Sequence, residues 1–227
     1  MKPEFYANLF RQYSTYMTGW SEKKLFRVAS GANGGDYNWT EVLMRDIPAS
    51  LMEGIALHHY TVIKWEQKGP ARDFTEQQYF GSMRSALQME ELVTRHSTIM
   101  DKYDPAKRVA LVVDEWDDVE PGTNPGILYQ QNTIRDAMIA GVTLNIFNNH
   151  ADRVRMANLA QAVNVLQSVI LTNKEKMILT PTYHVMEMYN VHQDATLLPL
   201  QLTTANYTLG NDKLPAVSGS ASKNAAG

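Results

Sequence analysis

Short apolar runs alternate with amphipathic stretches along this chain, and this order limits the folds open to it. The apolar runs predict strands at 25–30, 54–57, 109–113 and about 156–164. Helical spacing of apolar residues predicts helices at 3–19, 40–47, 75–103, 128–147 and 180–191, with Thr40 as the cap of the second. Strands without polar alternation are buried on both faces, so the pattern indicates a parallel α/β sheet.

Two architectures fit this order, an open doubly wound sheet and a (β/α) barrel. The dinucleotide-binding form of the open sheet needs G-x-G-x-x-G after a strand, and the segment GANGGD at 31–36 does not have that spacing. The barrel is therefore favoured. Residues 195–202 then suggest a new β segment with little left to pair with, and the small, polar residues 218–227 are expected to be disordered.

Composition excludes several classes of function. The 227 residues are 44% hydrophobic, which is enough to bury a substantial core. A formal net charge of -3 without a basic run argues against a nucleic-acid partner. No stretch approaches the roughly 18 apolar residues that cross a bilayer, so we expect a soluble protein with no membrane partner. The sequence leaves the compartment open, and an intracellular location is only slightly favoured. The absence of cysteine removes thiolate metal sites and disulfides.

An acidic cluster follows the apolar run at 109–113 directly, at Asp114, Glu115, Asp117 and Asp118, with Trp116 in its middle. In parallel α/β folds the chemistry lies where strands end and loops begin, and Glu115 has that position. A solvated acidic loop, a calcium site and a helix cap are the alternatives. The alternating acids do not match the D-x-D-x-D-G calcium pattern, and Pro121, Gly122 and Pro125 are expected to keep the segment in a loop.

A second polar group, His58, His59 and Tyr60, ends the apolar run at 54–57. A histidine at such a place is often structural, and the chain has no H-E-x-x-H motif or suitably spaced third ligand, so we expect no metal. Tyrosine and histidine beside a carboxylate suit a polar pocket for a hydroxylated ligand.

Four separated motifs together carry a resemblance to a known family. They are DYNWTE at 36–41, LHHY at 57–60, DEW at 114–116 and NNHADRVRMANLAQAVNVL at 148–166. In this order they resemble the α-L-arabinofuranosidases of glycoside hydrolase family 51. The resemblance implies a (β/α)8 barrel with an appended β-sandwich, and cleavage of terminal arabinofuranosyl residues with retention of configuration.

The resemblance also implies roles for individual residues. Glu115 matches the nucleophile at the end of the seventh barrel strand, and Tyr60 matches the tyrosine beside it. Gln161 lies in the segment that resembles the sugar-contacting glutamine of the family. His58 and His59 line the same strand end, and Trp116 is expected to offer the sugar an apolar wall. No metal or organic cofactor is implied.

The chain departs from the family in two ways. Asp117 stands where many relatives have asparagine. More importantly, the family's general acid/base belongs to an Asn-Glu pair, and this sequence contains no such dipeptide. The helix at 3–19 resembles the one that follows that pair. We therefore expect a fragment, with roughly the second half of the barrel at 1–194 and the start of a β domain at 195–227.

The expected partner is an arabinose-containing oligosaccharide or polysaccharide, and the complete protein could form a homo-oligomer. Alone, the fragment is expected to be inactive. The alternatives are a non-catalytic carbohydrate-binding half-barrel and another retaining barrel glycosidase acting on xylan or glucan. The segment 157–161, ANLAQ, favours the arabinofuranosidase because barrel geometry alone does not require it.

Overall fold

The structure, a computed structural model, describes residues 1–17, 19, 22, 24–66, 68–118, 128 and 130–226. Its internal contacts divide the chain into two compact units. Unit 1 contains Met1–His59, Glu91–Glu115 and Asp152–Asn158. Unit 2 contains Tyr60–Glu90, Trp116–Ala151 and Leu159–Gly227.

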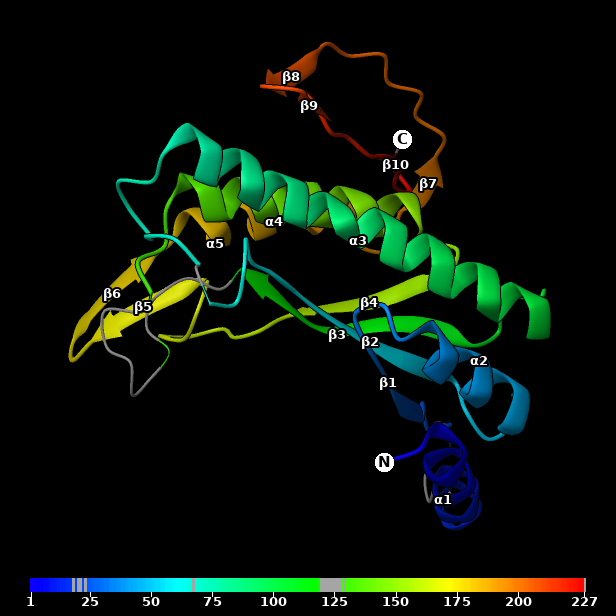
Figure 1. Ribbon diagram of the computed structural model, residues 1–227. Helices are drawn as coiled ribbons and strands as arrows, with labels where there is room; N and C mark the ends of the chain where they lie inside the picture. The colour runs from blue at the N-terminus through cyan, green and yellow to red at the C-terminus, as the bar shows by residue number, and fades with distance from the viewer. Residues whose placement is uncertain are drawn as a thin grey trace. The chain divides into compact units, whose positions relative to one another are not determined.

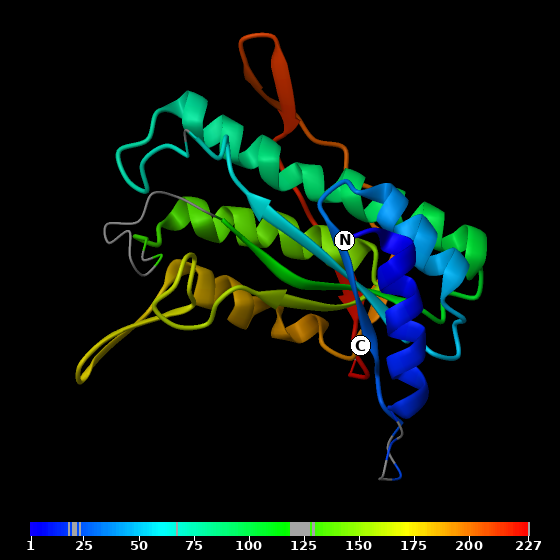
Figure 2. The same cartoon turned by 60° about the horizontal axis from the view of Figure 1, so that its bottom comes forward.

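A four-stranded sheet with the order β1-β2-β3-β4 carries the candidate site (Figures 1 and 2). Its strands are β1 (Val28–Asn33), β2 (Gly54–Thr61), β3 (Ala110–Asp118) and β4 (Val154–Leu159). Strands β1 and β2 pair in parallel. The Ala110 N–H donates to the Glu53 carbonyl at the start of β2 and β3, 2.8 Å away, and the Ala160 N–H donates to the Trp116 carbonyl where β3 and β4 end, 3.1 Å away. The predicted parallel α/β sheet is therefore confirmed.

Helices alternate with these strands, largely as the sequence predicts. They are α1 (Pro3–Tyr16), α2 (Tyr37–Asp46), α3 (Glu76–Tyr103), α4 (Ile134–Asn149) and α5 (Pro181–Tyr189), followed by the short 3-10 helix η1 (Asn190–His192). Among the described residues, no helix is long and apolar enough to cross a membrane.

Two helix starts differ from the prediction. Helix α2 begins at Tyr37, with Asp36 as its cap, because the Asp36 carboxylate accepts from the Trp39 N–H. The predicted cap, Thr40, is instead buried inside the helix, and its Oγ1 lies 2.9 Å from His96 Nδ1. Helix α4 begins at Ile134 rather than 128, because Thr133 and Asp136 form a reciprocal capping box there.

Strand β3 is longer than the apolar run that predicted it. It continues through Asp118, so the acidic cluster lies in a strand and not in a loop. The predicted loop residues Pro121, Gly122 and Pro125 lie outside the described residues. Strand β4 begins and ends earlier than predicted, since it occupies Val154–Leu159 and not 156–164.

The core of unit 1 forms around the sheet from the apolar residues of the strands and of helices α2 and α3. Fully buried members include Ala29, Leu43, Ile55, Leu57, Val93, Met100, Leu111 and Val113. Strands β1 and β2 approach closely at Gly31, where an added Cβ would lie 1.5 Å from the Ala56 carbonyl oxygen. Only glycine fits this contact, which accompanies a register shift between Ala29 and Ala32.

A buried ion pair anchors the beginning of β3 and β4. Arg153 is 1% exposed, and its Nη1 lies 3.2 Å from Asp104 Oδ2. The same nitrogen donates to the Val109 carbonyl at 2.8 Å. Asp104 also accepts from the Val109 N–H. Val109, the residue before β3, is thus hydrogen-bonded to this ion pair through both its N–H and its carbonyl.

The remaining β structure is a set of short antiparallel pairs in unit 2. Strand β5 (Ile170–Asn173) pairs with β6 (Lys176–Leu179), β8 (Asn206–Leu209) with β9 (Asp212–Pro215), and β7 (Thr196–Leu198) with β10 (Ala221–Lys223). The pairing of β10 corrects two expectations, since the described residues 218–226 contain a strand where disorder was expected, and β7 has a partner.

The physical reason for this order is a set of serine hydroxyls. Asn145 Nδ2 donates to Ser218 Oγ at 3.2 Å, and Asn148 Nδ2 donates to Ser220 Oγ at 3.1 Å. A small, polar tail can therefore be ordered by specific hydrogen bonds that its composition does not reveal. The proposed domain boundary at 194 stays a prediction.

Candidate active site

The candidate site lies in unit 1, where β2 and β3 bring His58, Asp114 and Glu115 together. His58 Nε2 lies 2.9 Å from Asp114 Oδ1. His58 Nδ1 lies 3.2 Å from Glu115 Oε2. Each of the two ring nitrogens of His58 therefore lies next to a different carboxylate.

The site is open to solvent without being fully exposed. The side chains of His58, Asp114 and Glu115 are 37%, 36% and 40% exposed. Asp114 Oδ1 has no accessible surface, however, and no aligned hydrogen-bond donor among the described residues. The 2.9 Å approach of His58 Nε2 to Asp114 Oδ1 therefore lacks the alignment of a hydrogen bond.

Three further predicted site residues, Tyr60, Trp116 and Gln161, belong to unit 2, whereas His59 belongs to unit 1. Tyr60 lies in β2, half-buried, with its ring 6.3 Å from that of Trp65. Trp116 is 2% exposed and packs edge-on against Phe147. The structure places this indole in a core, and its predicted contact with a sugar stays a prediction. Gln161 is exposed and follows Ala160, whose N–H donates to the Trp116 carbonyl.

Asp114 and Asp117 have partners that sequence reasoning missed. The sequence shows Asp114 only as part of an acidic cluster, although it contacts His58. Asp117 is buried and accepts from the Gln167 N–H at 3.3 Å. The Gln167 side chain in turn donates to the Thr182 hydroxyl at 3.1 Å. No signal in the sequence pairs Asp117 with Gln167, since the two are distant along the chain.

The described residues contain no group of three or more His, Cys, Asp or Glu side chains that could hold a metal ion. His58 contacts both acids directly, Asp114 through Nε2 and Glu115 through Nδ1. Their arrangement suits acid, base or nucleophile chemistry by a carboxylate beside an imidazole.

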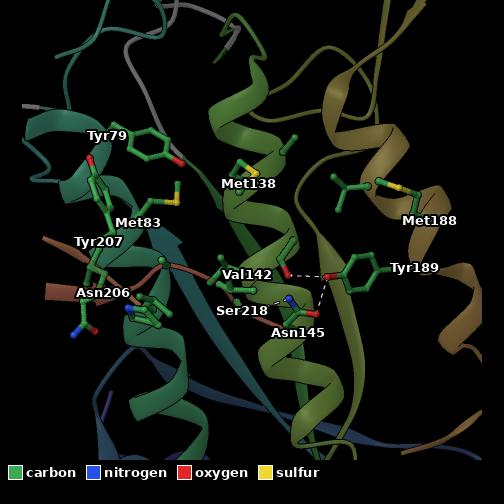
Figure 3. Close-up of a pocket in the computed structure, with 18 residues that line it drawn as sticks. Tyr79, Met83, Met138, Val142, Asn145, Met188, Tyr189, Asn206, Tyr207 and Ser218 are labelled. Atoms are coloured by element: carbon green, nitrogen blue, oxygen red, sulfur yellow. Dashed lines mark hydrogen bonds between the residues drawn. The ribbon is translucent and has the colours of Figure 1, made fainter. Parts of the chain in front are cut away.

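Unit 2 contains an apolar cavity of about 790 Å³ (Figure 3). Residues of α3, α4, α5 and the segment 206–218 line it, among them Met83, Val142 and Met188. Two of its polar side chains are hydrogen-bonded to each other, since the Tyr189 hydroxyl donates to Asn145 Oδ1 at 2.7 Å. None of the predicted site residues lines this cavity.

The fold and the site together define a class, namely α/β proteins with an acidic residue and a histidine on neighbouring parallel strands. The family model of the α-L-arabinofuranosidase C-terminal domain matches residues 114–225, beginning at Asp114. An intracellular exo-α-L-arabinofuranosidase of Bacteroides ovatus is 50% identical over 99% of this chain. The chain belongs to glycoside hydrolase family 51, the α-L-arabinofuranosidases.

Solved structures agree with this assignment. The family 51 arabinofuranosidase of Xanthomonas axonopodis pv. citri matches all of this chain with a TM-score of 0.95 and 49% identity. A family 51 α-L-arabinofuranosidase from Bifidobacterium longum shares the fold, with a TM-score of 0.77 at 19% identity over 96% of the chain. The chain spans 44% of the Bacteroides protein and 47% of each of these two structures.

Proposed function

We propose that this chain forms one half of the catalytic domain of a retaining α-L-arabinofuranosidase, with Glu115 as its nucleophile. The observation that carries the proposal is the half-exposed Glu115 carboxylate on a parallel strand, 3.2 Å from His58 on the neighbouring strand. A retaining glycosidase needs such a carboxylate to attack the anomeric carbon and form a glycosyl-enzyme intermediate. The substrate is a terminal α-L-arabinofuranosyl residue of an oligosaccharide or polysaccharide.

The finer architecture is part of the same proposal. The sheet β1 to β4 and its helices form the second half of a (β/α)8 barrel, and the short strands after residue 194 begin a β-sandwich. The alternation of parallel strands with helices supports the first statement, and the change to antiparallel pairs supports the second. An intracellular location and a homo-oligomer complete the proposal, the former supported by the name of the Bacteroides relative.

Retaining hydrolysis needs a second carboxyl group, about 5 to 5.5 Å from the nucleophile, to protonate the leaving oxygen. We assign this role to an Asn-Glu pair outside the present sequence. Without it, the 227-residue chain should be a poor catalyst. Loss of general acid assistance typically costs about 10² to 10⁴ in rate, and more for substrates with poor leaving groups.

The test uses the full reading frame that contains this chain, beside the 227-residue chain alone. Glu115→Ala in the longer protein should reduce release of the aglycone from an aryl α-L-arabinofuranoside by orders of magnitude. Azide should then restore part of the turnover and give a glycosyl azide of inverted configuration. Glu175→Ala, at an exposed position, is the matched control and should leave activity unchanged.

Near-normal activity of the Glu115→Ala variant would remove Glu115 from the mechanism. If the parent protein binds arabino-oligosaccharides but never turns them over, the non-catalytic carbohydrate-binding role replaces the proposal. Full activity from the short chain would show that the acid lies within the 227 residues.

A further inference from the structure

A fully buried histidine, His96 on α3, links the end of β1 to helix α2. Its Nε2 lies 2.9 Å from the carbonyl oxygen of Gly34, in the turn after β1. Its Nδ1 lies 2.9 Å from Thr40 Oγ1, on α2. All three residues belong to unit 1. The two ring nitrogens of His96 thus have partners on two other elements of the same unit.

These partners determine which nitrogen of His96 carries the hydrogen. A carbonyl oxygen can only accept, so Nε2 is the N–H nitrogen. Burial lowers the pKa of His96, the Gly34 carbonyl and Asp36 oppose this shift, and Arg95 reinforces it. The ring is therefore neutral near pH 7, and Nδ1 accepts from the Thr40 hydroxyl.

The Gly34 peptide connects this histidine to the candidate site. The Gly34 N–H donates to the His58 carbonyl at 2.9 Å, which continues the parallel pairing of β1 and β2 beyond the partners Asn33 and His58. Gly34 has a φ of +58°, a left-handed conformation that glycine adopts readily. Its carbonyl is thus bound by His96 and its N–H is bound at the residue whose ring contacts both acids.

The motif DYNWTE at 36–41 supplies contacts that hold the His96 ring in place. The Tyr37 ring lies 4.7 Å from the ring of His96. Trp39 Nε1 donates to the Ser30 carbonyl at 3.0 Å, which fixes the start of α2 against β1. The position of the His96 N–H is therefore set by the packing of α2 and α3 around the end of β1.

We infer that His96 is a positioning residue for the reaction, because it fixes the Gly34 turn and, through it, the backbone of His58 beside the proposed nucleophile. The inference rests on the proposed function, since it concerns the geometry in which Glu115 attacks. The backbone of His58 determines where its ring lies, and Nδ1 of that ring is 3.2 Å from Glu115 Oε2. A displacement of about 1 Å can cost about 100-fold in rate, so a looser end of β2 lowers turnover.

Two substitutions separate this role from one of filling the core. The amide nitrogen of glutamine reaches about as far as Nε2 of histidine, so His96→Gln keeps a donor for the Gly34 carbonyl. The amide of asparagine reaches only as far as Nδ1, so His96→Asn loses that donor. Asparagine also leaves a larger cavity, and the deciding measurements are therefore local ones. His184→Gln and His184→Asn, at an exposed position on α5, are the matched controls.

The measurements use the full reading frame that contains this chain. Hydrogen exchange of the Gly34 amide reports its bond to the His58 carbonyl, and the Leu111 amide, bonded to the Arg153 carbonyl, is the reference at the other end of the strands. In His96→Asn the Gly34 amide should exchange at least about 10-fold faster, with Leu111 unchanged. In the same variant kcat for an aryl α-L-arabinofuranoside should fall at least about 10-fold and KM should change less. His96→Gln should recover most of both.

Unchanged exchange of the Gly34 amide in folded His96→Asn would overturn the inference, and so would equal losses of kcat in the two variants. If His96→Asn does not fold, His96→Gln decides, since faster exchange of Gly34 or a lower kcat in it would contradict the role. Failure of both variants to fold would assign His96 to overall stability instead. An inactive parent protein would refute the glycosidase proposal, and exchange of Gly34 would then decide alone whether His96 fixes the turn. An active parent with an unchanged kcat in His96→Asn would refute the inference only.

Discussion

His58 Nδ1, on β2, lies 3.2 Å from Glu115 Oε2, on β3. Neither residue is buried, and no local motif links them. Their contact follows from the pairing of two parallel strands whose carboxyl ends lie together. The sheet thus places an imidazole beside the proposed nucleophile before any loop or ligand contributes.

Tyr60 is predicted to orient the Glu115 carboxylate by a hydrogen bond in the complete enzyme. Tyr60→Phe removes only the hydroxyl, so it should lower kcat by more than it weakens ground-state binding. Steady-state kinetics on an aryl α-L-arabinofuranoside would measure both parameters. Tyr13→Phe, at an exposed position on α1, is a suitable control. An unchanged kcat in Tyr60→Phe would refute the role.

Glu53 should make the stability of the protein depend on pH in the acid range. Hydrogen bonds from the Arg27 side chain lower the pKa of Glu53 from 4.5 to about 2. Because the folded pKa is the lower one, the ionised carboxylate stabilises the fold above about pH 4.5, and this stabilisation is lost as the pH falls towards 2. It amounts to something on the order of 3 kcal/mol.

The measurement is urea unfolding of the parent and of Glu53→Gln between neutral pH and pH 2. The variant should be less stable at neutral pH, and the gap should close in acid. Glu175→Gln, at an exposed position, should follow the parent throughout. A gap that is constant with pH would show that Glu53 contributes by packing and not by its charge.

Trp116 is expected to matter for stability whatever its role with ligands. Its side chain is 2% exposed and meets Phe147 with ring centroids 5.6 Å apart. Trp116→Ala should therefore lower the free energy of unfolding by about 3 to 5 kcal/mol. Trp65→Ala, which truncates an indole that is 59% exposed, should cost far less in the same denaturation assay. Equal losses would contradict the placement of Trp116.

Gly31 should tolerate no side chain. A Cβ at this position would lie 1.5 Å from the Ala56 carbonyl oxygen, so Gly31→Ala must separate β1 from β2. We expect a loss of more than about 3 kcal/mol of unfolding free energy, or insoluble protein. At Gly35 the nearest atom to an added Cβ is 3.5 Å away, and Gly35→Ala should melt close to the parent temperature. Similar melting temperatures for both variants would contradict the close approach.

The sequence predicts the order of strands and helices because apolar periodicity is a local signal. It does not predict how far β3 extends, since Asp114 and Asp117 read as residues of a loop. In the structure both lie in the strand and contact groups distant in the sequence, His58 in the first case and the Gln167 N–H in the second. The order of residues 218–226 was missed for the same reason, since its hydrogen-bond partners lie on α4.

The candidate site was predictable in part. Strand ends point to Glu115 and His58, and family motifs add Tyr60 and Gln161, whose roles stay predictions. The contact between His58 and Asp114 needs the register of two strands, which no single segment encodes. Likewise, Trp116 reads as a ligand-facing aromatic beside a carboxylate, and only the position of Phe147 shows that the indole is buried.

The buried pair of Arg153 and Asp104 holds the first residues of β3, while the acids that could perform chemistry occupy its last residues. At one end of the strand, selection therefore acts on the stability of the sheet, and at the other end it acts on the chemistry of the acids. A lineage could exchange the acids, and with them the reaction or the sugar, while the ion pair at the other end continued to secure the sheet. The residues that stabilise β3 and the residues that could react are at opposite ends of the strand, so the second group can change in evolution without loss of the first.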